Sequence, residues 1–214
     1  MNGSLWCSPG VFMAAVDDDV VILDVNSDAY HCLIDGAHTL SITSGGKLTL
    51  DDRLLASDLR DAGLIGPTSP QEKRLAPISA VRELSLSSSE PRSMVARVGV
   101  SWLIAGSIFR GKSLQALLSF HRRTPRPLRQ PEEDEIARIV GDARMARPWI
   151  PGEGACLQRS FQLRCVLARH GIATDWIFGV RTWPFGAHCW LQIGDLVVGD
   201  RLARVRRYTP IMRG

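Results

Sequence analysis

The sequence lacks the features that mark a disulfide-stabilised, metal-binding or membrane-spanning protein. Its five cysteines are odd in number and contain no C-x-x-C pair, which excludes the usual zinc ribbon and thioredoxin-type motifs. The most apolar stretch, 95–109, contains Arg97 and is shorter than the roughly 20 residues of a membrane span. The first residues lack the basic stretch and apolar run of a secretory signal. We therefore expect a cytoplasmic protein without a membrane segment, a metal or a cofactor.

The two halves of the chain carry net charges of opposite sign. Residues 1–80 hold five basic and eleven acidic residues, a net charge of −6, whereas residues 81–214 hold 21 basic and 11 acidic residues, a net charge of +10. Two halves of opposite charge indicate two domains with different roles. A Pro- and Ser-rich stretch at 67–93 is typical of a linker, with an ordered piece expected around 76–86. The predicted domains are therefore 1–66 and 94–214.

The N-terminal domain is expected to contain three strands followed by about three short helices. The pattern at 34–43 favours one short helix. Apolar residues recur at helical spacing over 54–62, with Thr49 as the expected cap and Gly63 as the stop. Apolar and β-branched runs place the strands at 11–16, 20–23 and 29–34.

The C-terminal domain is expected to contain helices first and strands afterwards. Helical patterns cover 94–122, either continuous or broken near Gly111, then 132–145 and 156–170. Strand patterns follow at 176–181, 188–193 and 196–200. The whole chain is therefore predicted to be an α+β protein.

Cys156 stands at the predicted start of a helix. The N–H groups and partial positive charge of a helix N-terminus lower the pKa of a cysteine there, and they can also hold an oxyanion. A buried structural cysteine is the alternative interpretation. His188 begins a strand whose alternation places Trp190 on the same face and Cys189 on the core side. Cys156 and His188 are therefore a candidate nucleophile and base.

Asp200 ends the next strand and would complete a Cys–His–Asp arrangement, in which the carboxylate orients the imidazole. A two-residue turn at 194–195 with regular pairing would direct Asp200 away from the face of His188. We therefore predict a three-residue loop or a bulge near 194–196. Asp195 and Asp175 are weaker candidates for the acid, because aspartates are common in turns.

The order of Cys156, His188 and Asp200 resembles the transglutaminase-like branch of the papain-type fold. The runs Cys156-Leu157-Gln158-Arg159-Ser160, Trp176-Ile177-Phe178-Gly179-Val180 and His188-Cys189-Trp190 are similar to the leader peptidases of lasso-peptide biosynthesis, often called B proteins. This resemblance implies a cysteine protease that cuts the leader–core bond of a ribosomally made precursor peptide. It also implies delivery of the core to an asparagine-synthetase-like cyclase, and Trp190 is expected to form a wall of the site.

The N-terminal half resembles the PqqD-like precursor-recognition domain, which has a winged helix-turn-helix fold. The resemblance implies that a leader binds as an added strand at 28–34, against a helix at 54–64. The side chains expected to form an apolar floor for the leader are Tyr30, Cys32, Leu55 and Leu59. Simple core packing is the alternative for each of them.

Other functions compete with this interpretation. A site of this kind can transfer an acyl group to an amine instead of water, and a catalytically inactive domain could serve as a scaffold for the precursor and the cyclase. Nucleic-acid binding is not expected, because the winged half is acidic and would repel phosphate. A metal site built from Cys156, Cys165, Cys189 and either His170 or His188 is disfavoured, because the spacing matches no common zinc pattern.

Overall fold

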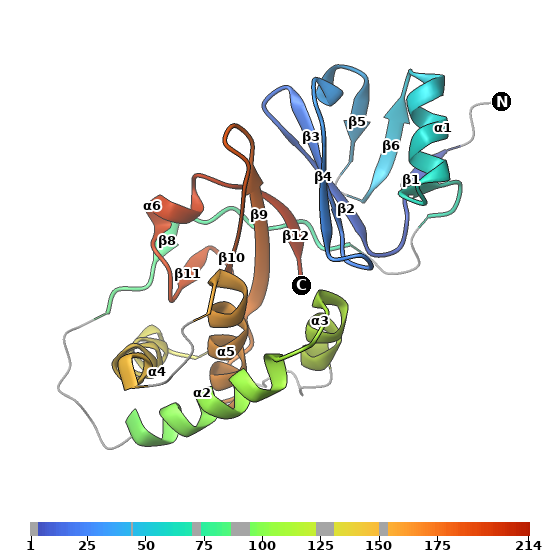
Figure 1. The fold of residues 1–214 in the computed structure, drawn as a ribbon. Coiled ribbons are helices and arrows are strands. Elements are labelled where there is room, and N and C mark those ends of the chain that lie inside the picture. The colour runs from blue at the N-terminus through green and yellow to red at the C-terminus, as the bar shows by residue number, and fades with distance from the viewer. Residues whose placement is uncertain (1–3, 44, 70–73, 87–94, 123–130, 150–153) are drawn as a thin grey trace. The chain divides into compact units, whose positions relative to one another are not determined.

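The computed structural model describes residues 4–43, 45–69, 74–86, 95–122, 131–149 and 154–214 (Figure 1). The chain divides into two compact units. Unit 1 comprises residues 1–77, 178–187 and 207–213, and unit 2 comprises residues 78–177, 188–206 and 214. The units do not coincide with the predicted domains 1–66 and 94–214, because unit 1 includes two segments from the C-terminal half.

Unit 1 is built mainly from short strands. Its elements are β1 (Leu5–Cys7), β2 (Val11–Val16), β3 (Asp19–Asp24), β4 (Ala29–Leu33), β5 (Leu40–Ile42), β6 (Lys47–Leu50), α1 (Arg53–Asp61), β7 (Ile65–Gly66) and β12 (Thr209–Arg213). One sheet has the order β5-β6-β1-β7 and another has the order β2-β3-β4. The second sheet is antiparallel and comprises the three strands predicted from the sequence. Within it, β4 is an edge strand.

The predicted helix at 34–43 is wrong. A 3-10 turn and β5 occupy this stretch, and Thr49 lies in β6 opposite Ser41 rather than capping a helix. The Gly46 N–H group donates to the Thr43 carbonyl (2.8 Å), which closes a β5–β6 hairpin. The cap of α1 is Asp52, whose Oδ1 accepts hydrogen bonds from two backbone N–H groups of the first turn. Among the described residues of 1–77, α1 is the only α-helix.

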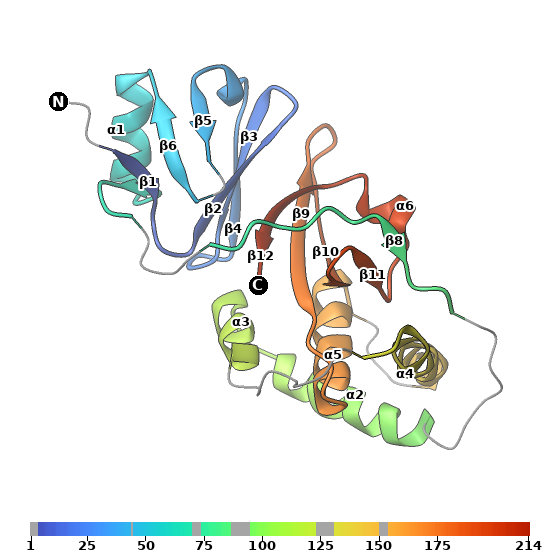
Figure 2. The ribbon, with the colours of Figure 1, turned by 180° about the vertical axis from the view of Figure 1, so that it is seen from behind.

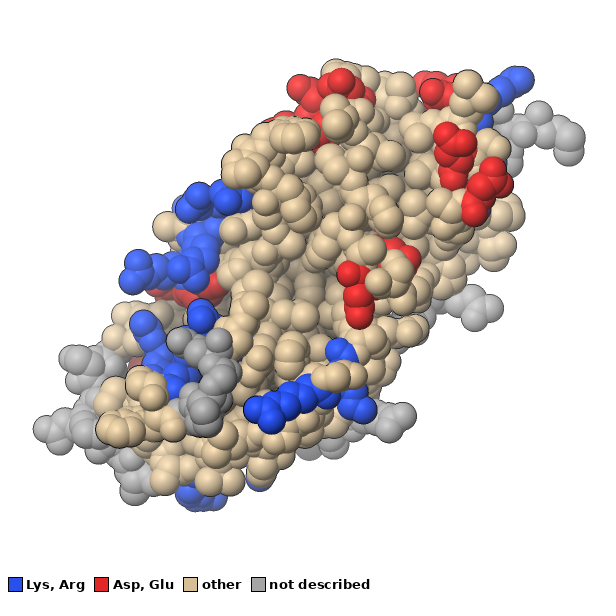
Figure 3. All heavy atoms as spheres, in the orientation of Figure 1, with Lys and Arg blue, Asp and Glu red and all other residues tan. Residues whose placement is uncertain are grey.

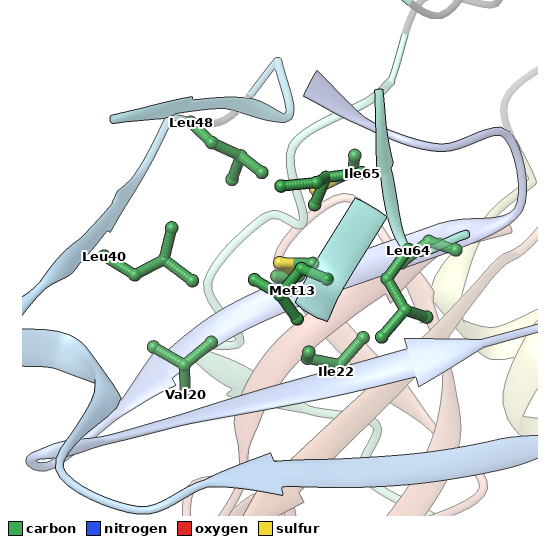
Figure 4. Packing of buried hydrophobic residues seen from close by; sticks show 10 residues of the cluster. Met13, Val20, Ile22, Leu40, Leu48, Leu64 and Ile65 are labelled. Carbon is green, nitrogen blue, oxygen red and sulfur yellow. The ribbon is translucent and has the colours of Figure 1, made fainter. Parts of the chain in front are cut away.

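A hydrophobic cluster, called here the N-terminal core, fills the interior of unit 1. It contains Cys7, Val11, Met13, Val20, Ile22, Leu40, Leu48, Leu59, Leu64 and Ile65. Figure 4 shows side chains from β2, β3, β5, β6 and the segment after α1 converging on one another. Each fully buried Leu or Ile contributes about 1.5–3 kcal/mol to folding. Because β3 supplies alternate residues to this cluster, its intervening residues face the other side of the sheet.

Unit 2 combines helices with a sheet. The helices are α2 (Val95–Phe109), α3 (Leu114–Arg122), α4 (Glu133–Ala146), α5 (Cys156–Arg169) and α6 (Leu202–Val205). The remaining strands are β8 (Arg82–Glu83), β9 (Asp175–Arg181), β10 (Gly186–Ile193) and β11 (Leu196–Val198), of which 178–181 in β9 and 186–187 in β10 belong to unit 1. The sheet that contains them has the order β12-β9-β10-β11-β8. These positions confirm the predicted α+β class, including the break between α2 and α3.

The helices α2, α4 and α5 pack against one another and carry much of the core of unit 2 (Figure 2). Helix α5 ends at Arg169, and Gly171, just after the cap residue, has a φ of 75° that is readily adopted only by glycine. Helix α2 is apolar over most of its length. None of the described helices, however, combines the length and the apolar character that crossing a membrane requires.

The predicted ordered piece of the linker is present as β8. This strand pairs in parallel with β11, and Arg82 lies opposite Leu196. The Arg82 guanidinium contacts Asp195 (3.2 Å) and Glu133 (2.6 Å), which ties β8 to the β10–β11 turn and to the start of α4. Residues 70–73 and 87–93 of the predicted linker lie outside the described residues.

Candidate active site

Cys156 is the first residue of α5 and is half-buried. The first bond within the helix runs from the Arg159 N–H group to the Ala155 carbonyl (3.1 Å). The N–H groups of Cys156 and Leu157 therefore have no acceptor within the helix, and the positive end of the helix dipole lies at the sulfur. This placement agrees with the sequence prediction and favours a thiolate at this position.

His188 connects Cys156 to Asp200. Its Nε2 lies 2.6 Å from Asp200 Oδ2, and its side chain also hydrogen-bonds to Cys156. Because Nε2 faces the carboxylate, Nδ1 is the nitrogen that faces the sulfur. The Trp190 ring is stacked near the imidazole, with centroids 6.0 Å apart and planes inclined by 24°. The three predicted residues, Cys156, His188 and Asp200, therefore come together, with Trp190 beside them.

The predicted loop between β10 and β11 is wrong. Ile193 pairs with Leu196, so the connection is a regular two-residue turn. Pairing ends at Val198, and Gly199 then adopts a φ of 79°. This left-handed residue changes the direction of the chain, so the carboxylate of Asp200 reaches the imidazole despite the regular turn. The irregularity that the site requires is located at the end of the strand instead of in the hairpin loop.

Substituting Gly199 with alanine is expected to disturb this connection. A Cβ at this position would overlap the Leu163 side chain, and the left-handed conformation alone costs about 1–2 kcal/mol for a non-glycine residue. We expect Gly199→Ala to lower the free energy of unfolding more than Gly194→Ala does. Gly194 is the matched control because it also has a positive φ but would place its Cβ in open space. Urea unfolding measures both, and equal losses would contradict the role given to Gly199.

A second cysteine lies beside Cys156. Cys189 is buried, as predicted, and its Sγ lies 3.3 Å from Ser160 Oγ, one turn along α5 from Cys156. Its side chain also hydrogen-bonds to the Cys156 sulfur. Trp176 Nε1 donates to Ser160 Oγ (2.8 Å), so the serine hydroxyl is held from two sides. The strand alternation predicts Cys189 only as a core residue, and a small polar residue one turn after Cys156, Ser160, is the sequence signal for this contact.

The pKa values of Cys156 and His188 are shifted strongly from their ordinary values. The hydrogen bond from Cys189, then that from His188, outweigh burial and lower the pKa of Cys156 to about 4. Burial opposes the charged form of His188, but hydrogen bonds to Asp200 and Cys156 outweigh it and raise the pKa of the imidazole to about 9. The pKa of each of the other four cysteines is raised. At neutral pH the site therefore holds a thiolate and an imidazolium.

Removing the second thiol should weaken the thiolate. In Cys189→Ala the hydrogen bond to the Cys156 sulfur is lost, so we expect the pKa of Cys156 to rise and its alkylation at pH 5 to slow several-fold. The pH dependence of iodoacetamide labelling at Cys156, followed by peptide mass spectrometry, measures the shift. Cys165→Ala is the control, since Cys165 also lies on α5 but has no contact with Cys156 in the described site. An unchanged labelling midpoint in Cys189→Ala would contradict this role.

The predicted leader-binding residues do not form one surface. Leu55 and Leu59 of α1 pack in or against the N-terminal core, which also holds alternate residues of β3. Tyr30 and Cys32 pair with the intervening residues of β3 and therefore lie on the opposite face of the sheet. Cys32 is exposed, and the Tyr30 ring contacts Phe185. The register of β4, rather than the residue types, decides this separation.

In the part of the chain that the structure describes, no three His, Cys, Asp or Glu side chains are grouped so that they could hold a metal ion. The thiolate, the imidazolium and the carboxylate are the groups that thiol-dependent acyl transfer uses. The family model of the transglutaminase-like superfamily matches residues 102–213, more than half of the chain, and the chain belongs to this superfamily. No curated protein and no solved structure matches the chain. The matched range contains Cys156, His188 and Asp200.

Proposed function

We propose that this protein is a cysteine peptidase that removes the leader from a lasso precursor peptide. The observation that carries the proposal is the contact of Cys156 with His188, whose Nε2 lies 2.6 Å from Asp200. The superfamily supports cysteine-protease-like or acyltransferase-like chemistry. The resemblance of the runs around Cys156 and His188 to lasso leader peptidases supports the choice of substrate.

In the proposed reaction the Cys156 thiolate attacks the carbonyl carbon of the leader–core bond. The N–H groups at the start of α5 stabilise the oxyanion, because they have no acceptor within the helix. The His188 imidazolium then gives its proton to the leaving amine, and the C–N bond breaks. A water molecule, deprotonated by His188, attacks the resulting thioester and releases the leader as a carboxylic acid. Asp200 keeps the imidazole oriented throughout.

Unit 1 is assigned the capture of the leader. The β4 strand is an edge of its three-stranded sheet, and edge strands accept a further strand through their backbone groups. Ile34, which follows β4, is 66% exposed and offers an apolar contact. Capture by unit 1 raises the concentration of the scissile bond near Cys156. The released core would then pass to an asparagine-synthetase-like cyclase.

The rate of this reaction should be constant over a broad pH range. Below about pH 4 the thiolate is protonated and the nucleophile is lost, and above about pH 9 the imidazolium is deprotonated and the leaving amine has no acid. We expect kcat/KM for precursor cleavage to be flat between these limits. A single rise of kcat/KM at about pH 8.5 would contradict the ion pair, because this is the pKa of an ordinary cysteine thiol.

Acyl transfer to an amine is the second candidate, because the superfamily includes acyltransferase-like members. Incubating the protein with a cognate precursor peptide in H₂¹⁸O separates the two reactions. Hydrolysis yields a free leader that carries one ¹⁸O in its new carboxylate. Transfer yields a cross-linked product without the isotope. Free, labelled leader is the expected product, and an amine-linked adduct would replace the peptidase with a transferase.

A further inference from the structure

Two cysteine side chains meet at the start of α5. The Cys156 sulfur is hydrogen-bonded both by the thiol and by the backbone N–H group of Cys189. Both residues line one pocket of unit 2. Cys156 is half-buried, whereas Cys189 is only 4% exposed. The proposed reaction uses only the first thiol. An accessible thiolate in contact with a buried thiol is the arrangement in which oxidation of the first sulfur can be completed by the second.

The Ser160 hydroxyl holds Cys189 in this position. Ser160 Oγ lies 3.3 Å from Cys189 Sγ, and it also donates to the Cys156 carbonyl (2.8 Å), one turn earlier on α5. Trp176 Nε1 donates to the same hydroxyl (2.8 Å). Because a hydroxyl carries a donor as well as acceptor sites, Ser160 can turn its proton toward the Cys189 sulfur when that sulfur gives up its own. Cys189 therefore lies where it can attack a modified Cys156 sulfur.

The third cysteine of unit 2 is too far along α5 to replace Cys189. Cys165 follows Cys156 by nine residues on this helix. At about 1.5 Å per residue this separates the two by roughly 13 Å along the helix axis, whereas the Cβ atoms of a disulfide are about 3.8 Å apart. The three cysteines of unit 2 are all among the described residues. Within unit 2, Cys189 is therefore the cysteine that Cys156 can reach.

We propose that Cys156 and Cys189 form a disulfide when a peroxide oxidises Cys156, and that this bond reversibly blocks the nucleophile. The Cys156 thiolate attacks one oxygen of hydrogen peroxide, the O–O bond breaks, and the departing hydroxide takes a proton from the His188 imidazolium. The product is a sulfenic acid on Cys156. The Cys189 sulfur then attacks the Cys156 sulfur, the S–O bond breaks, and the thiol proton leaves with the hydroxide. Two electrons pass from the sulfurs to the peroxide, and two water molecules form.

Capture by Cys189 decides whether the oxidation can be reversed. A sulfenic acid that meets no thiol is oxidised further to a sulfinic acid, which dithiothreitol does not reduce, whereas dithiothreitol does reduce a disulfide. Cys189 thus protects Cys156 from irreversible loss. Because the disulfide removes the Cys156 thiolate, cleavage stops until the bond is reduced. This consequence for cleavage rests on the proposed peptidase function, but the disulfide itself does not.

The disulfide can be detected in the full chain without any substrate. The reduced protein is treated with a small excess of hydrogen peroxide, free thiols are blocked with N-ethylmaleimide, and tryptic peptides are analysed by mass spectrometry. Trypsin cleaves after Arg159 and Arg181, so the two cysteines fall in different peptides. We expect a cross-linked pair that joins Cys156 to Cys189 and disappears on reduction. The basic side chains spread over the surface of unit 2 in Figure 3 attract anionic thiols such as glutathione, which is therefore left out of the reaction.

Matched variants separate the role of Cys189 from that of other thiols. In the wild type and in Cys165→Ala, dithiothreitol should restore most of the Cys156 thiol that peroxide removed. In Cys189→Ala it should restore roughly five-fold less, because Cys156 continues to the sulfinic acid. The variants are compared after equal loss of the Cys156 thiol, since the weaker thiolate of Cys189→Ala also slows the first step.

Several results would overturn the inference. They are a Cys156 that peroxide leaves unmodified, a sulfinic acid there without the cross-link, a cross-link from Cys156 to another cysteine, and equal recovery in Cys189→Ala. With a cognate precursor, peroxide should abolish cleavage and dithiothreitol should restore it, and cleavage by fully cross-linked protein would contradict the block. Absence of cleavage by the reduced protein would instead contradict the proposed function, and the peptide analysis would still show whether Cys189 captures the oxidised sulfur.

Discussion

Cys156→Ala is expected to abolish precursor cleavage while leaving leader binding and the fold unchanged. The pKa of Cys156 is lowered to about 4, whereas the contact with Cys156 raises the pKa of the neighbouring Cys189, so we expect the Cys156 sulfur to form the acyl intermediate. Removal of a catalytic nucleophile costs on the order of 10⁴-fold or more in rate. Alanine fits the half-buried first position of α5 without strain. Mass spectrometry of the reaction products measures cleavage, and fluorescence anisotropy of a labelled leader peptide measures binding.

Cys165→Ala is the control for this experiment, because it removes another thiol from the same helix. Burial raises the pKa of Cys165 to about 11, which makes this thiol a poor nucleophile at neutral pH. We expect the Cys165→Ala variant to cleave the precursor at the wild-type rate. Cleavage retained in Cys156→Ala would remove Cys156 as the nucleophile. Loss of both cleavage and leader binding in Cys156→Ala would contradict the assignment of binding to unit 1.

Asp200→Ala should have the second-largest effect, a fall of roughly 10²–10⁴-fold in kcat. Its carboxylate lies 2.6 Å from His188 Nε2, and it helps to raise the pKa of the imidazole. Without the carboxylate the imidazole is free to rotate, and its pKa falls, which narrows the pH range from the alkaline side. Steady-state kinetics between pH 5 and pH 9 measures both changes.

Asp195→Ala is the matched control for Asp200→Ala. Asp195 lies five residues earlier, in the β10–β11 turn, where it contacts the exposed guanidinium of Arg82. Both aspartates were candidates from the sequence, but only Asp200 contacts His188. We therefore expect Asp195→Ala to leave kcat unchanged. A larger loss in Asp195→Ala than in Asp200→Ala would contradict the choice of acid.

The chemistry of the site could be predicted from the sequence because it depends on local patterns. A cysteine at the start of an apolar helix and a histidine at the start of a strand are visible in the order of residues. The way in which Asp200 reaches His188 could not be predicted from the sequence. Two backbone arrangements satisfy the same alternation of faces: a regular turn followed by a left-handed Gly199, and a bulged turn without a left-handed residue. Cys189 was missed for a related reason: contact with Cys156 depends on how α5 packs against β10.

In the N-terminal half, most elements could be predicted from the sequence, but the placement of the candidate binding residues could not. Its three long strands follow from β-branched runs, and α1 from the spacing of its leucines. The stretch 34–43, which contains β5, is predicted as a helix because its few apolar residues match either period. The separation of Tyr30 and Cys32 from Leu59 depends on the face that β4 presents, which only the pairing with β3 determines. A shift of one residue would have placed them together.

The most direct test is to label the protein with a leader peptide whose last residue is replaced by propargylamine, so that an alkyne occupies the position of the scissile carbonyl. A thiolate positioned there adds to the alkyne and forms a stable vinyl thioether, whereas free thiols do so very slowly. We expect a single adduct, mapped to Cys156, that fails to form in His188→Ala. An adduct on the exposed Cys32, or no adduct at all with a leader that binds, would contradict it.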